Sequence, residues 1–221
     1  MPRKGTVGVT LLFLLCGCSA TLNIHPTLPP PTSAPVSQSK LGIYLSPGSV
    51  ANEYKEKQGS GIWLGTEYSF SPGRIIQNDL TTLTKRHYAN TGFAENSVDK
   101  RWDLVVEYFC YPPRFEPKSL KAEAPLELTL RNPHTGHTVD SATLFGRSPK
   151  QPGRILRLFT GRLAEKPALE KTLTTAYNDL YRKLDAALAR TVAREAYETK
   201  IRPYQKRDAE RRMRSRNRIE R

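Results

Sequence analysis

The chain has 221 residues, and its 35 Lys or Arg against 21 Asp or Glu give a formal net charge of +14. This length allows one domain with a real core and excludes two generous ones. The charge is unevenly spread, because residues 200–221 hold ten Lys or Arg against three Asp or Glu, a surplus of seven. Half of the basic character therefore lies at the C-terminal end.

The first eighteen residues have the features of a removable signal. Arg3 and Lys4 are positive, residues 7–15 are apolar, and Leu15-Cys16-Gly17-Cys18 follows. The apolar run is well short of the ~20 residues that cross a bilayer core, which argues against a permanent transmembrane helix. The pattern resembles the lipobox of bacterial lipoproteins.

This resemblance implies that a signal peptide, residues 1–17, is cut off between Gly17 and Cys18, with Leu15 as part of the cleavage motif. It also implies a covalent lipid such as palmitate on Cys18. In that family an Asp after the lipidated cysteine retains the protein in the inner membrane, and Ser19 stands there, so the resemblance favours the outer membrane, facing the periplasm. Two alternatives stay open: an ordinary secretory signal without lipid, and a short anchor that is never cut.

Residues 18–39 contain five prolines among Thr, Ser and Gln, which is typical of an extended tether between a lipid and a folded domain. Cys16 leaves with the signal and Cys18 takes the lipid, so Cys110 remains as the one free thiol. In an oxidising compartment such a thiol is expected to be buried and inert.

Alternating apolar residues predict a strand over 40–46, which Pro47-Gly48 ends. Residues 52–60 are polar and predict a loop, whereas the class of 61–70 is undecided. Ser71-Pro72 is typical of a helix start, and the apolar spacing predicts a helix that ends near residues 90–92, with Gly92 as its left-handed cap.

A clear strand is predicted over 102–111, with Trp102, Leu104, Val106, Tyr108 and Cys110 on one face. A polar connection leads to Pro125. Residues 126–131 and 138–145 then form a predicted hairpin around the Asn-Pro-His-Thr-Gly turn at 132–136.

The region 146–166 is basic, broken by Pro and Gly, and undecided in class. Beyond it, apolar residues at intervals of three and four from Leu169 to Val192 predict a long amphipathic helix, with a break at Pro203.

The predicted fold is α+β: a small mostly antiparallel sheet in the order strand, helix, three strands, helix, with both helices on one face. The domain spans 40–200 and a basic tail spans 201–221. This order resembles that of small outer-membrane assembly and transport-auxiliary lipoproteins.

The histidines are the first place to look for metal or catalysis. His134 and His137 flank a turn, but no Cys/His pair accompanies them, so no metal site is predicted. Gly59-Ser60-Gly61 is not a nucleophile elbow, and no phosphate-binding loop occurs. No catalytic residue and no cofactor other than the lipid are therefore predicted, and the protein is not expected to be an enzyme.

The tail carries forked arginine donors that suit phosphates or carboxylates. Export excludes nucleic acid as the usual partner and favours lipopolysaccharide, anionic lipid, peptidoglycan or an acidic protein face. The alternative is a solubilising end without a partner. The arginines are Arg207, Arg211, Arg212, Arg214, Arg216, Arg218 and Arg221.

The sequence thus predicts a membrane-anchored, non-enzymatic periplasmic lipoprotein with a structural, assembly or transport-accessory role in a cell-envelope complex. One alternative is direct binding of anionic polymers or lipids through the arginine tail. The other is an undetected periplasmic hydrolase, which a polar cluster around His134 and His137 would favour.

Overall fold

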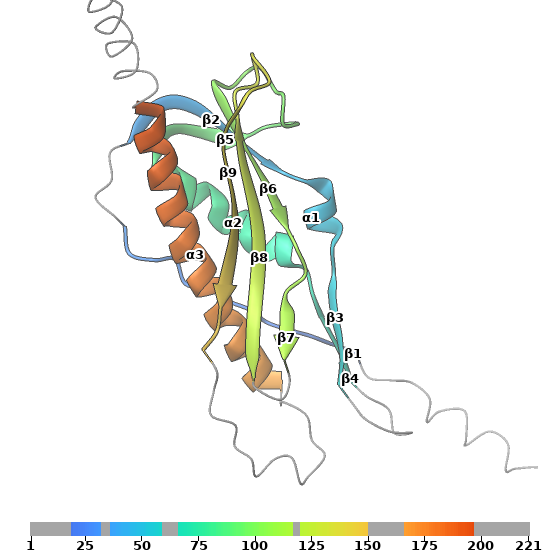
Figure 1. Ribbon diagram of the computed structural model, residues 1–221. Helices are drawn as coiled ribbons and strands as arrows, with labels where there is room; N and C mark the ends of the chain where they lie inside the picture. Colours follow the sequence, from blue (N-terminus) through green and yellow to red (C-terminus); the bar gives the residue numbers. More distant parts are fainter. Residues whose placement is uncertain (1–18, 32–35, 59–65, 117–119, 150–165, 197–221) are drawn as a thin grey trace, which may run out of the picture.

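The computed structural model describes residues 19–31, 36–58, 66–116, 120–149 and 166–196. Their elements form an elongated two-layer domain in which a sheet packs on helices (Figure 1). In chain order the elements are β1 (Ser19–Thr21), β2 (Ser37–Leu45), α1 (Pro47–Ala51), β3 (Tyr54–Gln58), β4 (Thr66–Phe70), α2 (Pro72–Lys85), β5 (Tyr88–Phe93), β6 (Leu104–Cys110), β7 (Arg114–Glu116), β8 (Lys121–Arg131), β9 (Thr138–Arg147) and α3 (Lys166–Ala196).

The main sheet has six strands. Its order is β5-β2-β6-β8-β7, and β9 also pairs with β8. β2 runs parallel to β5 and β6, whereas β8 is antiparallel to β6, β7 and β9. A second, three-stranded sheet in the order β1-β4-β3 extends one end of the domain.

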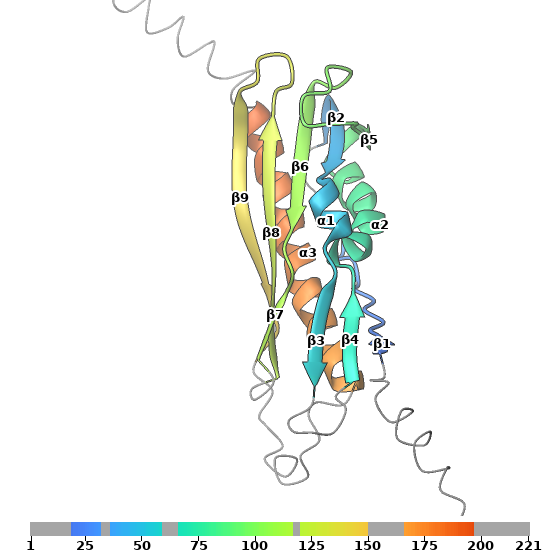
Figure 2. The same ribbon diagram turned by 90° about the vertical axis from the view of Figure 1, so that its right-hand side faces the viewer.

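Helices α2 and α3 cover one face of the main sheet, as Figure 2 shows after a quarter turn. The core between the layers is formed by the apolar stripe of α3 and by three aliphatic residues of α2, namely Ile76, Leu80 and Leu83, all of which are buried. The α+β prediction is confirmed, and so is the long C-terminal helix. Three of the five strand pairings in the main sheet are antiparallel.

The strands expected at 40–46, 102–111, 126–131 and 138–145 are present as β2, β6, β8 and β9. The prediction of a polar connection before Pro125 is wrong, because β7 and the first residues of β8 pair there as strands. After Pro112-Pro113 the chain forms the short strand β7 and then returns as β8. Residues 150–165, Pro203 and the tail lie outside the described residues.

The helix predicted to end near residue 90 ends at Lys85, and β5 follows directly. Gly92 is therefore a strand residue and not a helix cap. A Cβ on Gly92 or Gly42 would lie 2.7 Å from the Trp102 ring, so both glycines are needed for close approach of that ring. Trp102 precedes β6 and lies on the sheet face opposite to Leu104, which corrects the face predicted for it.

The polar segment predicted as a loop at 52–60 contains β3, which forms an antiparallel pair with β4. Tyr54 is buried, and its ring centroid lies 5.0 Å from that of Phe70. One aromatic pair thus anchors a strand whose other residues are polar. Within the undecided stretch 61–70, β4 begins at Thr66, and residues 59–65 lie outside the described part.

The segment predicted as a free tether differs most from expectation. Ser19–Thr21 is a strand, and Leu22 and Ile24 are buried in the core. The Asn23 amide donates to Glu170 and the Thr27 amide to Asn178, both on α3. Residues 19–31 are thus a strap that lies on the domain, because two apolar side chains that precede the prolines are buried in the core.

Candidate functional site

The site residues predicted from the sequence belong to the two ends of the chain. Ser19, the first described residue, pairs with Glu67 in the small sheet. Leu15, Gly17 and Cys18 lie outside the described residues, but Cys18 is bonded to Ser19 in the chain. A lipid on Cys18 would therefore be one residue away from β1, with no spacer between them.

Helix α3 ends at the opposite end of the domain. Its 31 residues span about 46 Å at 1.5 Å per residue, from Lys166 at the end of the domain that holds the small sheet to Ala196 at the far end (Figure 1). The arginines predicted to bind anions, residues 207–221, lie outside the described residues. Ala196, the last described residue, lies at the end of the domain away from Ser19.

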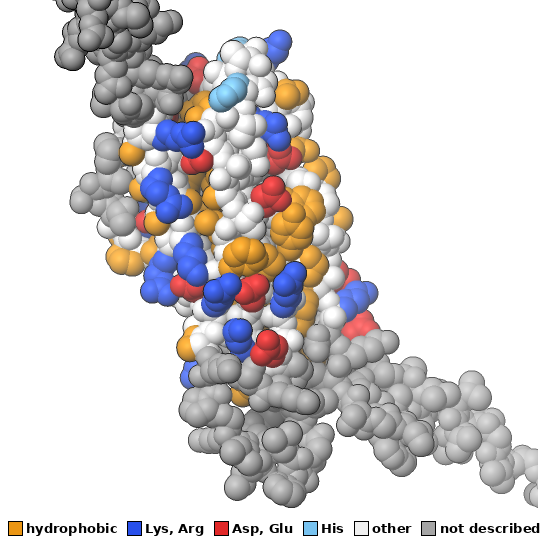
Figure 3. Space-filling model, viewed as in Figure 1, with side chains coloured by type: hydrophobic (Ala, Val, Ile, Leu, Met, Phe, Trp, Pro, Cys, Tyr) orange, Lys and Arg blue, Asp and Glu red, His pale blue; other side chains and the backbone are white. Residues whose placement is uncertain are grey.

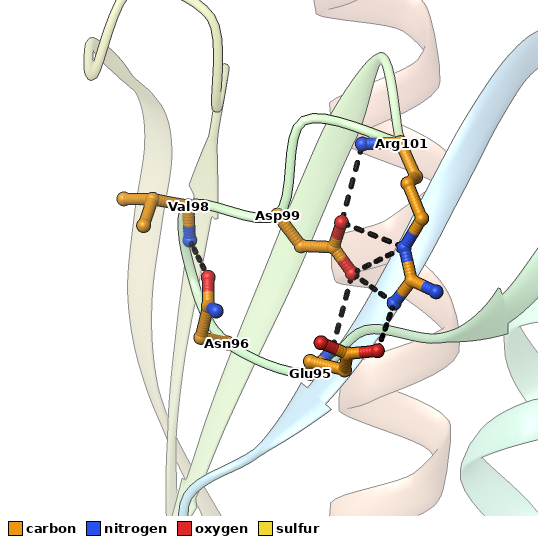
Figure 4. A network of polar contacts seen from close by, with 5 residues as sticks. All are labelled: Glu95, Asn96, Val98, Asp99 and Arg101. Atoms are coloured by element: carbon orange, nitrogen blue, oxygen red, sulfur yellow. Dashed lines mark hydrogen bonds and ion pairs between the residues drawn. The ribbon is translucent and has the colours of Figure 1, made fainter.

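The connection between β5 and β6 at the far end is held by one carboxylate (Figure 4). Asp99 accepts hydrogen bonds from the amides of Glu95 and Arg101 and from the Arg101 guanidinium, at 2.6 to 3.2 Å. The side-chain hydrogen bond from Arg101 keeps the pKa of Asp99 well below its usual value of 3.8. Val98, 57% exposed, is presented at the tip of this ordered loop.

The turn between β8 and β9 carries the two histidines considered as ligands. The side chain of Asn132 accepts hydrogen bonds from the amides of His134 and Thr135, which fixes the turn, and both histidines are exposed. Across the described residues, no group of three His, Cys, Asp or Glu side chains is placed to hold a metal ion. The turn is a polar hairpin end in this structure.

Another histidine, His87, is buried. Its Nε2 lies 2.9 Å from Asp185 Oδ1, and both side chains are almost fully enclosed between α2 and α3. Arg86 approaches the same carboxylate at 3.8 Å. Sequence reasoning missed this cluster, although a signal was present: Asp185 stands three residues before Leu188, at the spacing of the apolar stripe.

Cys110 is buried, as predicted. Burial raises the pKa of its thiol from 9.0 to about 12, while the contact with Ser49 opposes part of this rise. Its backbone amide donates to the Ser49 hydroxyl at 2.8 Å. The thiol is thus held protonated at neutral pH, which is unsuited to a nucleophile.

None of the helices in the described part of the chain is long and apolar enough to cross a membrane. The described domain is elongated, with Ser19 and the small sheet at one end and the loops that join β5 to β6 and β8 to β9 at the other.

This two-layer arrangement is the α+β fold of a known bacterial structure. Protein XCC0632 from Xanthomonas campestris, described by the family model DUF330, superposes with a TM-score of 0.52 at 11% identity, over 83% of this chain and 99% of that one. At this identity the likeness concerns the fold alone.

Weaker similarities were also found. The hypothetical protein CT253 from Chlamydia trachomatis gives a TM-score of 0.41 at 7% identity, over 71% of this chain and 98% of that one. A putative neuraminyllactose-binding hemagglutinin homolog from Helicobacter pylori gives 0.41 at 12%, over 80% and 99%. No protein-family model and no curated protein sequence matches the chain.

Proposed function

We propose that the chain is a lipid-anchored, non-enzymatic accessory protein of the cell envelope, facing the periplasm from the outer membrane. The observation that carries the proposal is the position of Ser19. It follows the lipobox cysteine directly and is already part of a strand at one end of the domain.

This position has a consequence for how the anchored protein would stand. With no spacer after Cys18, the small sheet β1-β4-β3 would rest near the lipid surface. The main strands and α3 run away from that end, so the far end of the domain would project about 46 Å into the periplasm by helix length. The body is thus suited to bridge a membrane and a partner that stands above or beside it.

The anchor is tested by labelling cells with radioactive palmitate. The expected result is incorporation into the full chain and its loss in Cys18→Ala, together with a shift of the variant from the membrane to the soluble fraction. Cys16→Ala is the matched control and should keep both the label and the membrane fraction. Unchanged fractionation of Cys18→Ala would refute the anchor.

A second candidate function is direct binding of an anionic envelope polymer through the arginine tail. The favouring observation is that α3 ends at the end of the domain away from Ser19, so the tail starts far from the anchoring membrane. Deletion of residues 205–221 should then weaken binding to purified lipopolysaccharide or peptidoglycan, and the difference should shrink in high salt. Equal binding of the full and shortened chains would refute this role.

A further inference from the structure

The outer face of the main sheet, opposite α2 and α3, carries aromatic side chains. Strand alternation places Phe109 of β6 and Phe145 of β9 on this face, together with Tyr111 just after β6. Hydrophobic side chains gather over the middle of the sheet in Figure 3, beside acidic and basic ones. We call Phe109, Tyr111, Phe145 and the neighbouring Glu127 the outer patch.

The outer patch is a contiguous surface. Phe109 stands opposite Glu127 in the sheet register, and Glu127 stands opposite Thr143. The ring centroids of Phe109 and Tyr111 are 4.6 Å apart. Tyr111 and Phe145 are 38% and 37% exposed and belong to the five exposed large hydrophobic residues of the described chain. Aromatic residues are enriched at protein interfaces relative to the rest of the protein surface.

The charges around the outer patch are matched at its borders and unmatched at its centre. Arg131 lies 3.7 Å from Glu107 at one border, and Arg147 lies 2.9 Å from Glu123 at the other. Glu127 accepts a hydrogen bond from the Tyr111 hydroxyl at 2.8 Å. In the described part of the chain, no Lys or Arg nitrogen lies within ion-pair distance of Glu127.

This combination discriminates between kinds of partner. An anionic lipid or polymer would bring negative charge to an uncompensated carboxylate. The planes of Phe109 and Tyr111 are inclined at 61°, so the two rings form no common flat platform for stacking against sugar rings. A protein segment with a basic side chain among apolar ones would bury the rings and supply the missing charge.

We propose that the outer patch is a docking surface for another protein, which inserts apolar side chains against Phe109, Tyr111 and Phe145 and a Lys or Arg beside Glu127. The surface is independent of the lipid anchor. Since the strands run along the length of the domain, the patch faces sideways, and its partner lies beside the body of the protein.

The proposal is tested by photo-crosslinking of the full chain in the cells that produce it. A benzophenone amino acid replaces Thr143, an exposed residue opposite Glu127, and Arg182 on the exposed side of α3 serves as the matched control. We expect a discrete adduct with a different polypeptide at position 143 and none at 182. The crosslinked peptide, mapped by mass spectrometry, should contain Lys or Arg next to aliphatic or aromatic residues.

Charge variants then test the central contact. Glu127→Lys in the crosslinking chain should reduce the adduct at least tenfold, and Glu127→Gln should reduce it less, with circular dichroism confirming that both variants fold. An adduct that survives Glu127→Lys would overturn the proposal. The same holds for a missing adduct, for an adduct with a second copy or with residues 150–165 of the same chain, and for attachment to lipid or glycan alone.

Discussion

The Nε2 nitrogen of His87 lies 2.9 Å from the Oδ1 oxygen of Asp185, inside the contact between α2 and α3. His87 follows the end of α2, and its backbone carbonyl accepts a hydrogen bond from the Ser37 amide at the start of β2. One buried residue therefore connects both covering helices to the sheet. His87 Nδ1 has no hydrogen-bond partner in the described structure, so the contact with Asp185 is the ring's main polar anchor.

We predict that Asp185→Ala destabilises the domain by about 2 kcal/mol, because it leaves a buried imidazole without its acceptor. Urea unfolding at pH 7 measures the loss. Arg182→Ala on the exposed side of the same helix is the control and should change stability by less than about 0.5 kcal/mol, as surface substitutions do. An equally small effect of Asp185→Ala would show that the contact between His87 and Asp185 contributes nothing to the stability of the domain.

A second prediction concerns the contact between β9 and α3. A Cβ at Gly146 would lie 2.2 Å from the backbone oxygen of Ala176, an atom that cannot move away without shifting the helix. Gly146→Ala should therefore cost about 1–3 kcal/mol through overpacking. Gly48→Ala is the matched control, because its added Cβ would meet Phe109 at an ordinary 3.5 Å. Thermal unfolding of the two variants makes the comparison, and equal melting temperatures would refute the packing argument.

The elements that could be predicted from the sequence are those whose periodicity is local. The alternation through β6 and the three-and-four spacing through α3 are visible without knowing what covers them. The end of α2 could not be predicted in this way. The helical spacing continued as far as His87, and Gly92 had the features of a helix cap. Gly92 is instead in β5, where the ring of Trp102, ten residues later in the chain, packs against it and leaves no space for a Cβ.

Polar and proline-rich stretches were mispredicted for a related reason. β3 is a strand because Tyr54 packs on Phe70, and the strap is ordered because Leu22 and Ile24 reach the core. In both cases one or two apolar contacts across the fold outweigh the composition of the segment. The His87 and Asp185 pair joins residues 98 positions apart, so the polar Asp185 on the apolar stripe is visible in the sequence but its partner is not.

The third prediction is a loss of stability in alkali. Burial raises the pKa of Cys110 from 9.0 to about 12 and that of Tyr88 from 10.0 to about 12. Well below pH 9 both groups are protonated in the folded and in the unfolded chain. The stability linked to their raised pKa values is therefore fully present there. Between pH 9 and 12 mainly the unfolded chain loses these protons, so folding becomes progressively less favourable.

Urea unfolding of a chain that starts at Ser19, at about pH 7, 9 and 10, measures this decline. Cys110→Ala removes one of the two groups, so its stability should fall less between pH 7 and pH 10 than that of the parent. Native Cys110 should also resist thiol reagents at about pH 8 and react after unfolding in urea. Rapid modification of the native chain would contradict the burial of the thiol.

The fourth prediction distinguishes a strap from a tether. If residues 19–31 belong to the domain, Leu22→Ala should destabilise it by about 2–4 kcal/mol, as truncation of a buried leucine does. Leu22 is 3% exposed, whereas His25 in the same segment is exposed, so His25→Ala is the matched control and should be close to neutral. Urea unfolding of both variants gives the comparison. A tether would leave the two variants equally stable, and the domain of a chain lipidated at Cys18 would then be free to stand away from the lipid surface. If Cys18 carries the proposed lipid, a strap would hold β1 and the small sheet beside that surface, because Ser19, directly after Cys18, is part of β1.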